Sequence, residues 1–381
     1  LCMQVAAPAR LSIPGFRRAA VPWVLAGAGL LLFFTGGIRV LPYKGRELAL
    51  NLPGARTVHR SHSPFGTLEV IASDKLRIAP GLSYAFQGEL PLQHGLYLDG
   101  DLTGSIDHIT GPESTRYLLH QSPAAVFSLH DRPSVLVAGL GGGGEVERAL
   151  AAGASHVTVS EPNPHLPALL QHTFGSFTGG LFAGSRVAVT TRDLRTLVIG
   201  SDRPWDIVDV SGIAGASRTI GGVYAVETSY LLTVEAFRKY LGVLAPGGTF
   251  TVSMPLQYPP RNLLKLADTA RRALELEGLD WTDRIVVLRS WSDGTLLVGK
   301  QPFSRRDIAA VRDFSERMLF DLVYFPGITP EDVNRYTVVE DALYARYVDR
   351  ILRNDRSFFR DYPFTVRAPT DDRPSFSYFF R

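Results

Sequence analysis

Between residues 134 and 299, short apolar runs alternate with longer stretches whose apolar positions recur every three to four residues. Apolar runs of about five residues are typical of buried parallel strands, and the longer spacing is typical of amphipathic helices. The seven predicted strands are 134–138, 156–160, 185–190, 205–210, 249–253, 284–290 and 295–299. The pattern therefore predicts an α/β fold with a mainly parallel seven-stranded sheet and helices on both faces.

The last two predicted strands are separated only by the turn 291–294, so they should be antiparallel. Earlier in the chain, alternating runs at 66–72 and 95–98 are punctuated by turn-forming pairs such as Asp-Gly. We expect a small antiparallel β unit over 51–115, entered through a linker at 51–60. Residues 116–301 would form the α/β domain and 302–381 a helical C-terminal extension.

The stretch 19–38 contains no charged residue and is flanked by Arg17, Arg18 and Arg39. Twenty residues suffice to cross a hydrocarbon core of roughly 30 Å, so a transmembrane helix is predicted within a membrane segment at 1–50. The alternative is a buried helix of a soluble domain. The flanking charges are balanced and leave the orientation open, and we expect the protein in the cell membrane with its α/β domain in the cytoplasm.

The composition and charge of the chain argue against several classes of function. A net charge of +3, with basic residues scattered along the chain, argues against a nucleic-acid partner. The single cysteine, Cys2, excludes a disulfide framework and a cysteine-built metal site. No histidine pair has the spacing of a helical metal site, so we predict no metal.

A glycine-rich turn lies between the first predicted strand and a helix that starts near Glu145, and it contains Gly139, Gly141 and Gly143. Glu161 follows at the end of the next strand, about twenty residues after the turn. Glycines let the backbone approach a ligand, and an acid at that strand tip can accept hydrogen bonds from ribose hydroxyls. This order of strand, glycine turn, helix, strand and acid predicts a nucleoside site. The alternative is an ordinary tight turn.

Several motifs together resemble those of the spermidine synthases, aminopropyltransferases with the S-adenosylmethionine-dependent methyltransferase fold. The similar segments are Leu96-Tyr-Leu-Asp-Gly100, the turn 135–144, Val159-Ser-Glu-Pro-Asn-Pro164, Arg186 to Asp193, Leu232-Thr-Val-Glu-Ala-Phe237 and Leu244-Ala-Pro-Gly-Gly248. Together with the apolar stretch, the chain looks most like bacterial integral-membrane proteins that carry such a domain.

The resemblance implies a substrate and the residues that hold it. S-adenosylmethionine or its decarboxylated form would lie with its amino-acid part on the glycine turn, its ribose on Glu161 and its adenine amino group on Asp193. The expected partners are this small-molecule nucleoside and a membrane, with a homodimer as a candidate assembly.

The sequence departs from the family mainly at positions where the family has acidic residues. Ser211 stands where the family has its catalytic Asp, Ala214 where it has a second Asp, and Leu119 where it has an acid. The Asp of the family's glycine turn is Gly142 here, and the Gln that follows its Leu-Asp-Gly motif is Thr103. An amine must lose a proton before it attacks, so we expect little spermidine synthase activity on putrescine.

Two carboxylates are candidates for the missing base beside Ser211. Asp209 lies two residues earlier in the strand and so on the same face, although it could equally be a core carboxylate paired with a neighbour. Glu227 lies in a loop expected over the carboxyl ends of the strands, where its alternative is an exposed loop acid.

The sequence therefore supports a membrane-associated group transferase with an unknown acceptor. The alternative is a nucleoside-binding or regulatory domain that has lost the transfer chemistry. For the nucleoside site, Glu161→Ala is expected to abolish binding and leave the fold intact, because a carboxylate exposed at a strand tip contributes little to packing.

Overall fold

The computed structural model describes residues 23, 25, 27, 44–201, 203–213 and 229–381. The chain separates into two units, Leu1–Tyr43 and Lys44–Arg381. Within the described ranges, no helix combines the length and the apolar character that a membrane span requires. The span predicted at 19–38 falls almost wholly on residues outside the described ranges, so it stays a prediction.

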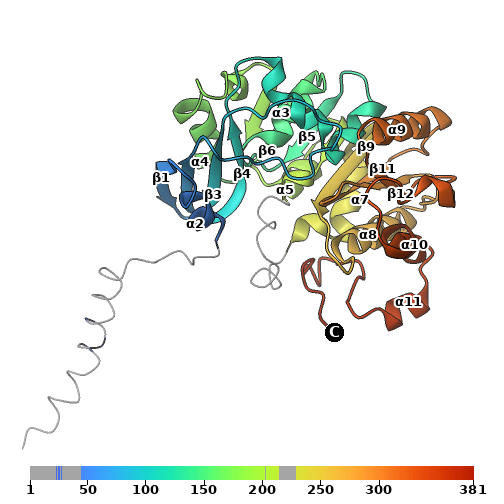
Figure 1. Cartoon of the computed structure of the whole chain (residues 1–381). Helices are drawn as coiled ribbons and strands as arrows, with labels where there is room; N and C mark the ends of the chain where they lie inside the picture. The colour runs from blue at the N-terminus through green and yellow to red at the C-terminus, as the bar shows by residue number, and fades with distance from the viewer. Residues whose placement is uncertain (1–22, 24, 26, 28–43, 202, 214–228) are drawn as a thin grey trace, which may run out of the picture. The chain divides into compact units, whose positions relative to one another are not determined.

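A mixed eight-stranded sheet forms the centre of the second unit, in the order β12-β10-β11-β9-β8-β5-β6-β7 (Figure 1). Its strands are β5 (Ser134–Ala138), β6 (His156–Ser160), β7 (Val187–Thr190), β8 (Trp205–Asp209), β9 (Leu244–Pro255), β10 (Ile285–Arg289), β11 (Asp293–Gly299) and β12 (Asp321–Tyr324). Strands β5 to β9 pair in parallel, whereas β11 is antiparallel to β9 and β10. All seven predicted strands are present, and the last two are antiparallel as predicted.

The eighth strand was not predicted, because only helices were expected beyond residue 301. Strand β12 pairs antiparallel with β10 and forms the edge of the main sheet. With four residues, two of them the buried Leu322 and Val323, it is too short to show a strand period in sequence. Its pairing was therefore visible only in three dimensions.

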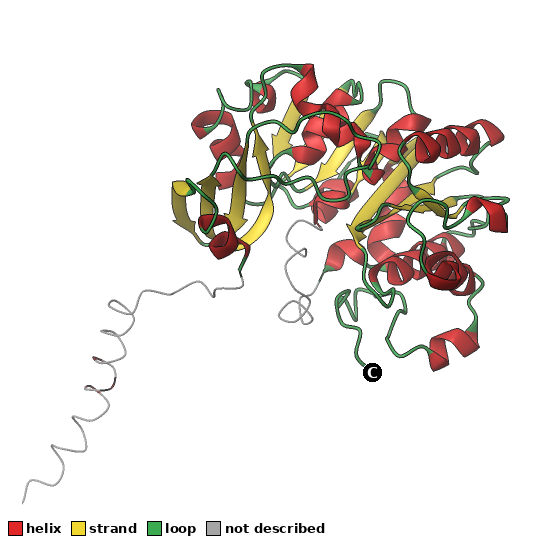
Figure 2. Cartoon of the chain, viewed as in Figure 1, coloured by secondary structure: helices red, strands yellow, loops and turns green. Residues whose placement is uncertain are grey.

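Helices cover both faces of the main sheet (Figure 2). They are α3 (Gly144–Ala151), α4 (His165–Ala168), α5 (Leu194–Ile199), α7 (Val234–Val243), α8 (Asn262–Leu276), α9 (Arg305–Arg317), α10 (Leu343–Leu352) and α11 (Arg356–Asp361). Successive residues of β5 enter different cores: Leu136 packs with α7 and α8, and Val135 and Val137 with α3 and α9. Both sheet faces are thus buried, which explains the uninterrupted apolar runs of the parallel strands.

Side-chain caps set where several helices begin. The Thr233 hydroxyl accepts a hydrogen bond from the Ala236 backbone N–H at the start of α7. Ser304 and Asp307 form a reciprocal capping box at the start of α9. Such bonds satisfy backbone donors that have no partner within the helix, so they fix its first residue.

The small β unit is antiparallel, as predicted, and has four strands in the order β1-β2-β3-β4. Its strands are β1 (Arg56–Ser63), β2 (Gly66–Ala72), β3 (Gln93–Leu98) and β4 (Asp101–Asp107), preceded by the short helix α2 (Gly45–Leu50). The linker predicted at 51–60 is wrong from Arg56 onward. Strand β1 is an edge strand whose side chains are mostly exposed, so its sequence lacks the alternation that reveals a half-buried strand.

Two 3₁₀ helices, η1 (Pro112–His120) and η2 (Ser122–Leu129), connect the small unit to β5. Helix η1 packs on α3 and η2 on α9. The connection thereby places β4 and η1 beside the glycine turn, where the candidate site is formed.

Candidate functional site

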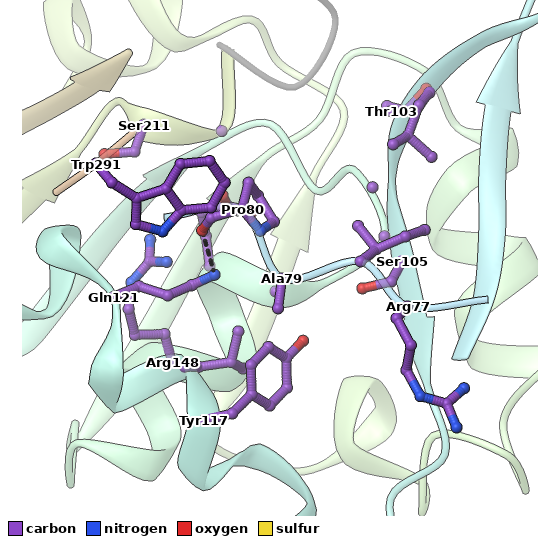
Figure 3. A pocket seen from close by; sticks show the side chains of 18 residues that line it. Arg77, Ala79, Pro80, Thr103, Ser105, Tyr117, Gln121, Arg148, Ser211 and Trp291 are labelled. Carbon is purple, nitrogen blue, oxygen red and sulfur yellow. Dashed lines mark hydrogen bonds between the residues drawn. The ribbon is translucent and has the colours of Figure 1, made fainter. Parts of the chain in front are cut away.

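A cavity of about 390 Å³ lies where the small β unit, η1, the β5–α3 turn, the end of β8 and the β10–β11 hairpin meet. It is lined by Arg77, Ile78, Ala79, Pro80, Leu102, Thr103, Gly104, Ser105, Tyr117, Leu118, Gln121, Gly142, Gly144, Glu145, Arg148, Ser211, Gly212 and Trp291. Figure 3 shows Ser211, Trp291 and Arg148 toward one end and Thr103, Ser105 and Arg77 toward the other. One wall is thus the glycine turn that the sequence singled out.

Strand β4 lies directly against the glycine turn. A Cβ atom added to Gly142 would stand 2.0 Å from the Ser105 carbonyl oxygen, and one added to Gly104 would stand 3.1 Å from the Gly142 nitrogen. No side chain fits at Gly142 unless the backbone moves. The close approach of β4 therefore accounts for the glycine at this position.

Glu161 lies at the end of β6, but its carboxylate is buried, with only 7% of the residue exposed. One carboxylate oxygen accepts a 2.9 Å bond from the Leu140 N–H and the other a 2.8 Å bond from the Asn163 N–H. Burial raises its pKa, against the opposing effect of these two bonds. The expectation of an exposed carboxylate is wrong: Glu161 holds the glycine turn against β6, with one further lone pair on each oxygen for a ligand.

Asp193 follows β7 and caps α5. Its carboxylate accepts a 3.0 Å bond from the Thr196 N–H and another bond from the Thr196 hydroxyl, and these bonds lower its pKa. The residue is exposed. Gly139, Gly141 and Gly143 all have positive φ, which favours glycine. The predicted nucleoside residues thus gather at the carboxyl ends of β5 to β7, while the cavity lies on the β4 side of the turn.

Asp209 is fully buried at the end of β8 and is not free to act as a base. Its carboxylate lies 3.1 Å from Arg148 Nη2 and accepts a 2.9 Å bond from the Ser211 N–H. Of the two alternatives left by the sequence, the structure supports the paired core carboxylate. Arg148 itself was missed, because nothing in a single sequence connects residues 61 positions apart.

Several buried polar atoms beside the cavity have no hydrogen-bond partner in the described chain. They are Ser211 Oγ, Arg148 Nε and both carboxylate oxygens of Glu147. Burial, reinforced by the nearby Asp107 and Glu145, holds the pKa of Glu147 well above its usual range. Buried polar groups are nearly always paired, so each of these atoms requires a physical explanation.

The charges that face the cavity differ from those that bind a diamine. Among the described lining residues Glu145 is the single carboxylate, and Arg77 and Arg148 are the cations. Glu227 and Ala214 lie outside the described residues. In the described part of the chain, no three His, Cys, Asp or Glu side chains are grouped to hold a metal.

Comparison with known proteins shows a similarity of structure. No family model and no curated protein sequence matches the chain. A solved spermidine synthase in complex with the transition-state analogue AdoDATO superimposes with a TM-score of 0.50 at 14% identity, covering 77% of this chain and 87% of that one. The chain has the spermidine synthase fold.

Two further solved structures are similar. The spermidine synthase of Thermotoga maritima gives a TM-score of 0.48 at 14% identity, covering 78% of this chain and 88% of that one. A probable spermidine synthase of Corynebacterium glutamicum gives 0.42 at 17% identity, covering 69% and 87%. Identities this low leave the activity to be argued from the site.

Proposed function

We propose that the protein is a group transferase of the spermidine synthase type, which binds S-adenosylmethionine or its decarboxylated form and transfers a carbon group from the sulfonium to an acceptor. One observation carries this proposal. In a fold shared with a spermidine synthase that binds AdoDATO, the glycine turn after β5 is joined to Glu161 at the end of β6, and a cavity adjoins the turn. Ligands of such sheets bind at the carboxyl ends of the strands.

In this proposal, the nucleoside binds on one side of the glycine turn and the acceptor binds on the other. The nucleoside would lie toward Glu161 and Asp193, and the acceptor would enter the cavity lined by Gly142 and Ser211. The acceptor's lone pair attacks the carbon bonded to sulfur, the carbon–sulfur bond breaks, and its electron pair remains on sulfur as a neutral thioether. Holding both reactants across one turn supplies the alignment that this displacement needs.

The acceptor also has to lose a proton. Asp209 is committed to Arg148, whereas the Glu145 carboxylate lines the cavity, so we propose Glu145 for this step. Glu227 remains a second candidate, outside the described residues. We keep membrane attachment through residues 19–38 as part of the proposal, on the strength of their length and composition.

The test is calorimetry on the full chain with S-adenosylmethionine, its decarboxylated form and methylthioadenosine. Glu161→Gln should weaken binding about 10- to 100-fold, because a hydrogen bond to a charged group contributes about 1.5–3 kcal/mol. Gln is preferred to Ala because its side-chain oxygen can still accept from one of the two backbone N–H groups, Leu140 or Asn163, whereas Ala leaves both without an acceptor.

The matched control is Glu331→Gln, an acid outside the glycine turn and the cavity. It should bind as the wild type does. Wild-type protein that binds none of the three nucleosides, or a Glu161→Gln variant of unchanged affinity, would refute the proposal.

A further inference from the structure

Two unpartnered polar atoms stand at the Ser211 end of the cavity. Ser211 is 5% exposed and Arg148 is 3% exposed, and both residues line the cavity. The Ser211 hydroxyl and the Arg148 Nε–H have no hydrogen-bond partner among the described residues. A buried donor without a partner loses its hydration without compensation, which is unfavourable. Both atoms would be satisfied by a ligand that accepts hydrogen bonds.

Asp209 keeps these two donors together. One carboxylate oxygen binds Arg148 Nη2 and the other binds the Ser211 backbone N–H. The guanidinium is therefore fixed next to the residue at which β8 ends. Figure 3 shows the Arg148 side chain reaching toward the end where Ser211 and Trp291 lie. The donors are held by the protein before any ligand arrives.

The charge of this end disfavours an ammonium ligand and favours a carboxylate. Asp209 is already neutralised by Arg148, and Glu145 is the single carboxylate among the described residues that line the cavity. An ammonium placed beside the Arg148 guanidinium would be desolvated next to a like charge, which is costly. A carboxylate would accept from Arg148 and from the Ser211 hydroxyl, in the charge-assisted geometry that arginine favours.

We propose that the Arg148–Ser211 end of the cavity binds a carboxylate of the substrate. The inference rests on the proposed function and names its substrate class. The carboxylate has two sources: the amino-acid part of S-adenosylmethionine, since Gly142 and Gly144 of the turn line the same cavity, or an amino-acid acceptor.

Two matched pairs of compounds distinguish these sources, because each pair differs by one carboxylate. Calorimetry on the full chain compares S-adenosylmethionine with its decarboxylated form. With methylthioadenosine present, it compares ornithine with putrescine. We expect the carboxylated member of one pair to bind at least tenfold more tightly, and that pair identifies the source.

Variants test whether Arg148 and Ser211 cause the preference. Ser211→Ala should reduce it several-fold, and Ser211→Asp should abolish or reverse it. The double variant Arg148→Met with Asp209→Asn should also abolish it and should fold, because both buried charges are removed and the Asn side-chain oxygen can still accept from the Ser211 backbone N–H. Ser315→Ala is the control, since the Ser315 hydroxyl is likewise buried and unpartnered but does not line the cavity.

The outcomes separate this inference from the function on which it rests. Binding of methylthioadenosine without a carboxylate preference in either pair overturns the inference alone. A preference that survives in both Ser211→Asp and the double variant does the same. If no nucleoside binds the wild type, the proposed function fails and the carboxylate site fails with it.

Discussion

The two sides of the glycine turn are built differently. On the β6 side, the chain satisfies its own polar groups: Glu161 accepts from the backbone of Leu140 and Asn163, and Asp193 caps α5. On the cavity side, the Ser211 hydroxyl, the Arg148 Nε–H and the Glu147 carboxyl are buried and have no hydrogen-bond partner among the described residues. The first side is complete without a ligand, whereas the second retains hydrogen-bonding capacity that the protein alone does not use.

This difference explains how the site departs from the family it resembles. The β6 side is held by bonds between segments close to the turn, so its motifs are recognisable in sequence. The cavity side depends on contacts between distant segments, among them β4 against Gly142 and Arg148 against Asp209.

The largest expected effect comes from breaking the pair that organises the cavity side. Arg148→Met leaves the fully buried Asp209 without its counter-ion. Removing one partner of a buried ion pair costs about 3–5 kcal/mol, because the remaining charge is uncompensated. Urea denaturation should show this loss in the free energy of unfolding.

The matched control for this prediction is Arg77→Met, which removes an exposed arginine from the same cavity and should cost less than about 1 kcal/mol. Adding Asp209→Asn to Arg148→Met should restore part of the stability, because the uncompensated charge is removed and the Asn side-chain oxygen can still accept from the Ser211 N–H. Equal losses for Arg148→Met and Arg77→Met would show that the ion pair contributes little and that the two sides differ less than we argue.

A smaller effect is expected where the two sides touch. Gly142→Ala places a Cβ 2.0 Å from the Ser105 carbonyl oxygen, so β4 or the turn must shift. Forcing atoms into such a contact costs typically about 1–3 kcal/mol. Thermal and urea denaturation should detect the loss, and nucleoside affinity should fall with it.

Gly144→Ala is the control within the same turn. Its added Cβ would meet no atom closer than Leu118 Cδ2 at 3.9 Å, so it should be neutral or slightly stabilising. If Gly142→Ala and Gly144→Ala were equally stable, the close approach of β4 could not be the reason that glycine stands at position 142.

Features that depend on local sequence patterns could be predicted, and features that depend on contacts between distant segments could not. The apolar runs predicted all seven strands from β5 to β11, because burial on both sheet faces leaves a strong local pattern. Edge strands β1 and β12 were missed, since one is mostly exposed and the other has only four residues. In the site, the glycine turn and Glu161 were found through local motifs.

Long-range pairing accounts for what the sequence could not show. Asp209 was recognised as a candidate, but its role depends on Arg148 in a helix formed by another part of the chain. Glu161 was expected at the surface, because a strand-tip acid gives no sign in sequence that two backbone N–H groups enclose it. Such facts depend on packing rather than on periodicity.

The last prediction concerns Glu147, the unpartnered acid behind the cavity. It is 1% exposed and its pKa is held well above the ordinary value of 4.5, chiefly by burial. Above about pH 4.5 the folded chain therefore keeps a proton that the unfolded chain releases. The folded state binds more protons in this window, so the contribution of Glu147 to stability falls as pH rises.

Glu147→Gln removes this titration and keeps the shape of the side chain. Its stability relative to the wild type should increase as the pH rises above about 4.5, because the unfolded wild type releases a proton there that its folded state keeps. Urea denaturation at several pH values measures the difference, and Glu145→Gln, a half-buried neighbour in the same helix, should change stability by only about 0.5 kcal/mol. A difference that stays constant with pH would mean that a ligand or ion compensates the Glu147 charge, and the cavity side would then resemble the β6 side more closely than the described contacts indicate.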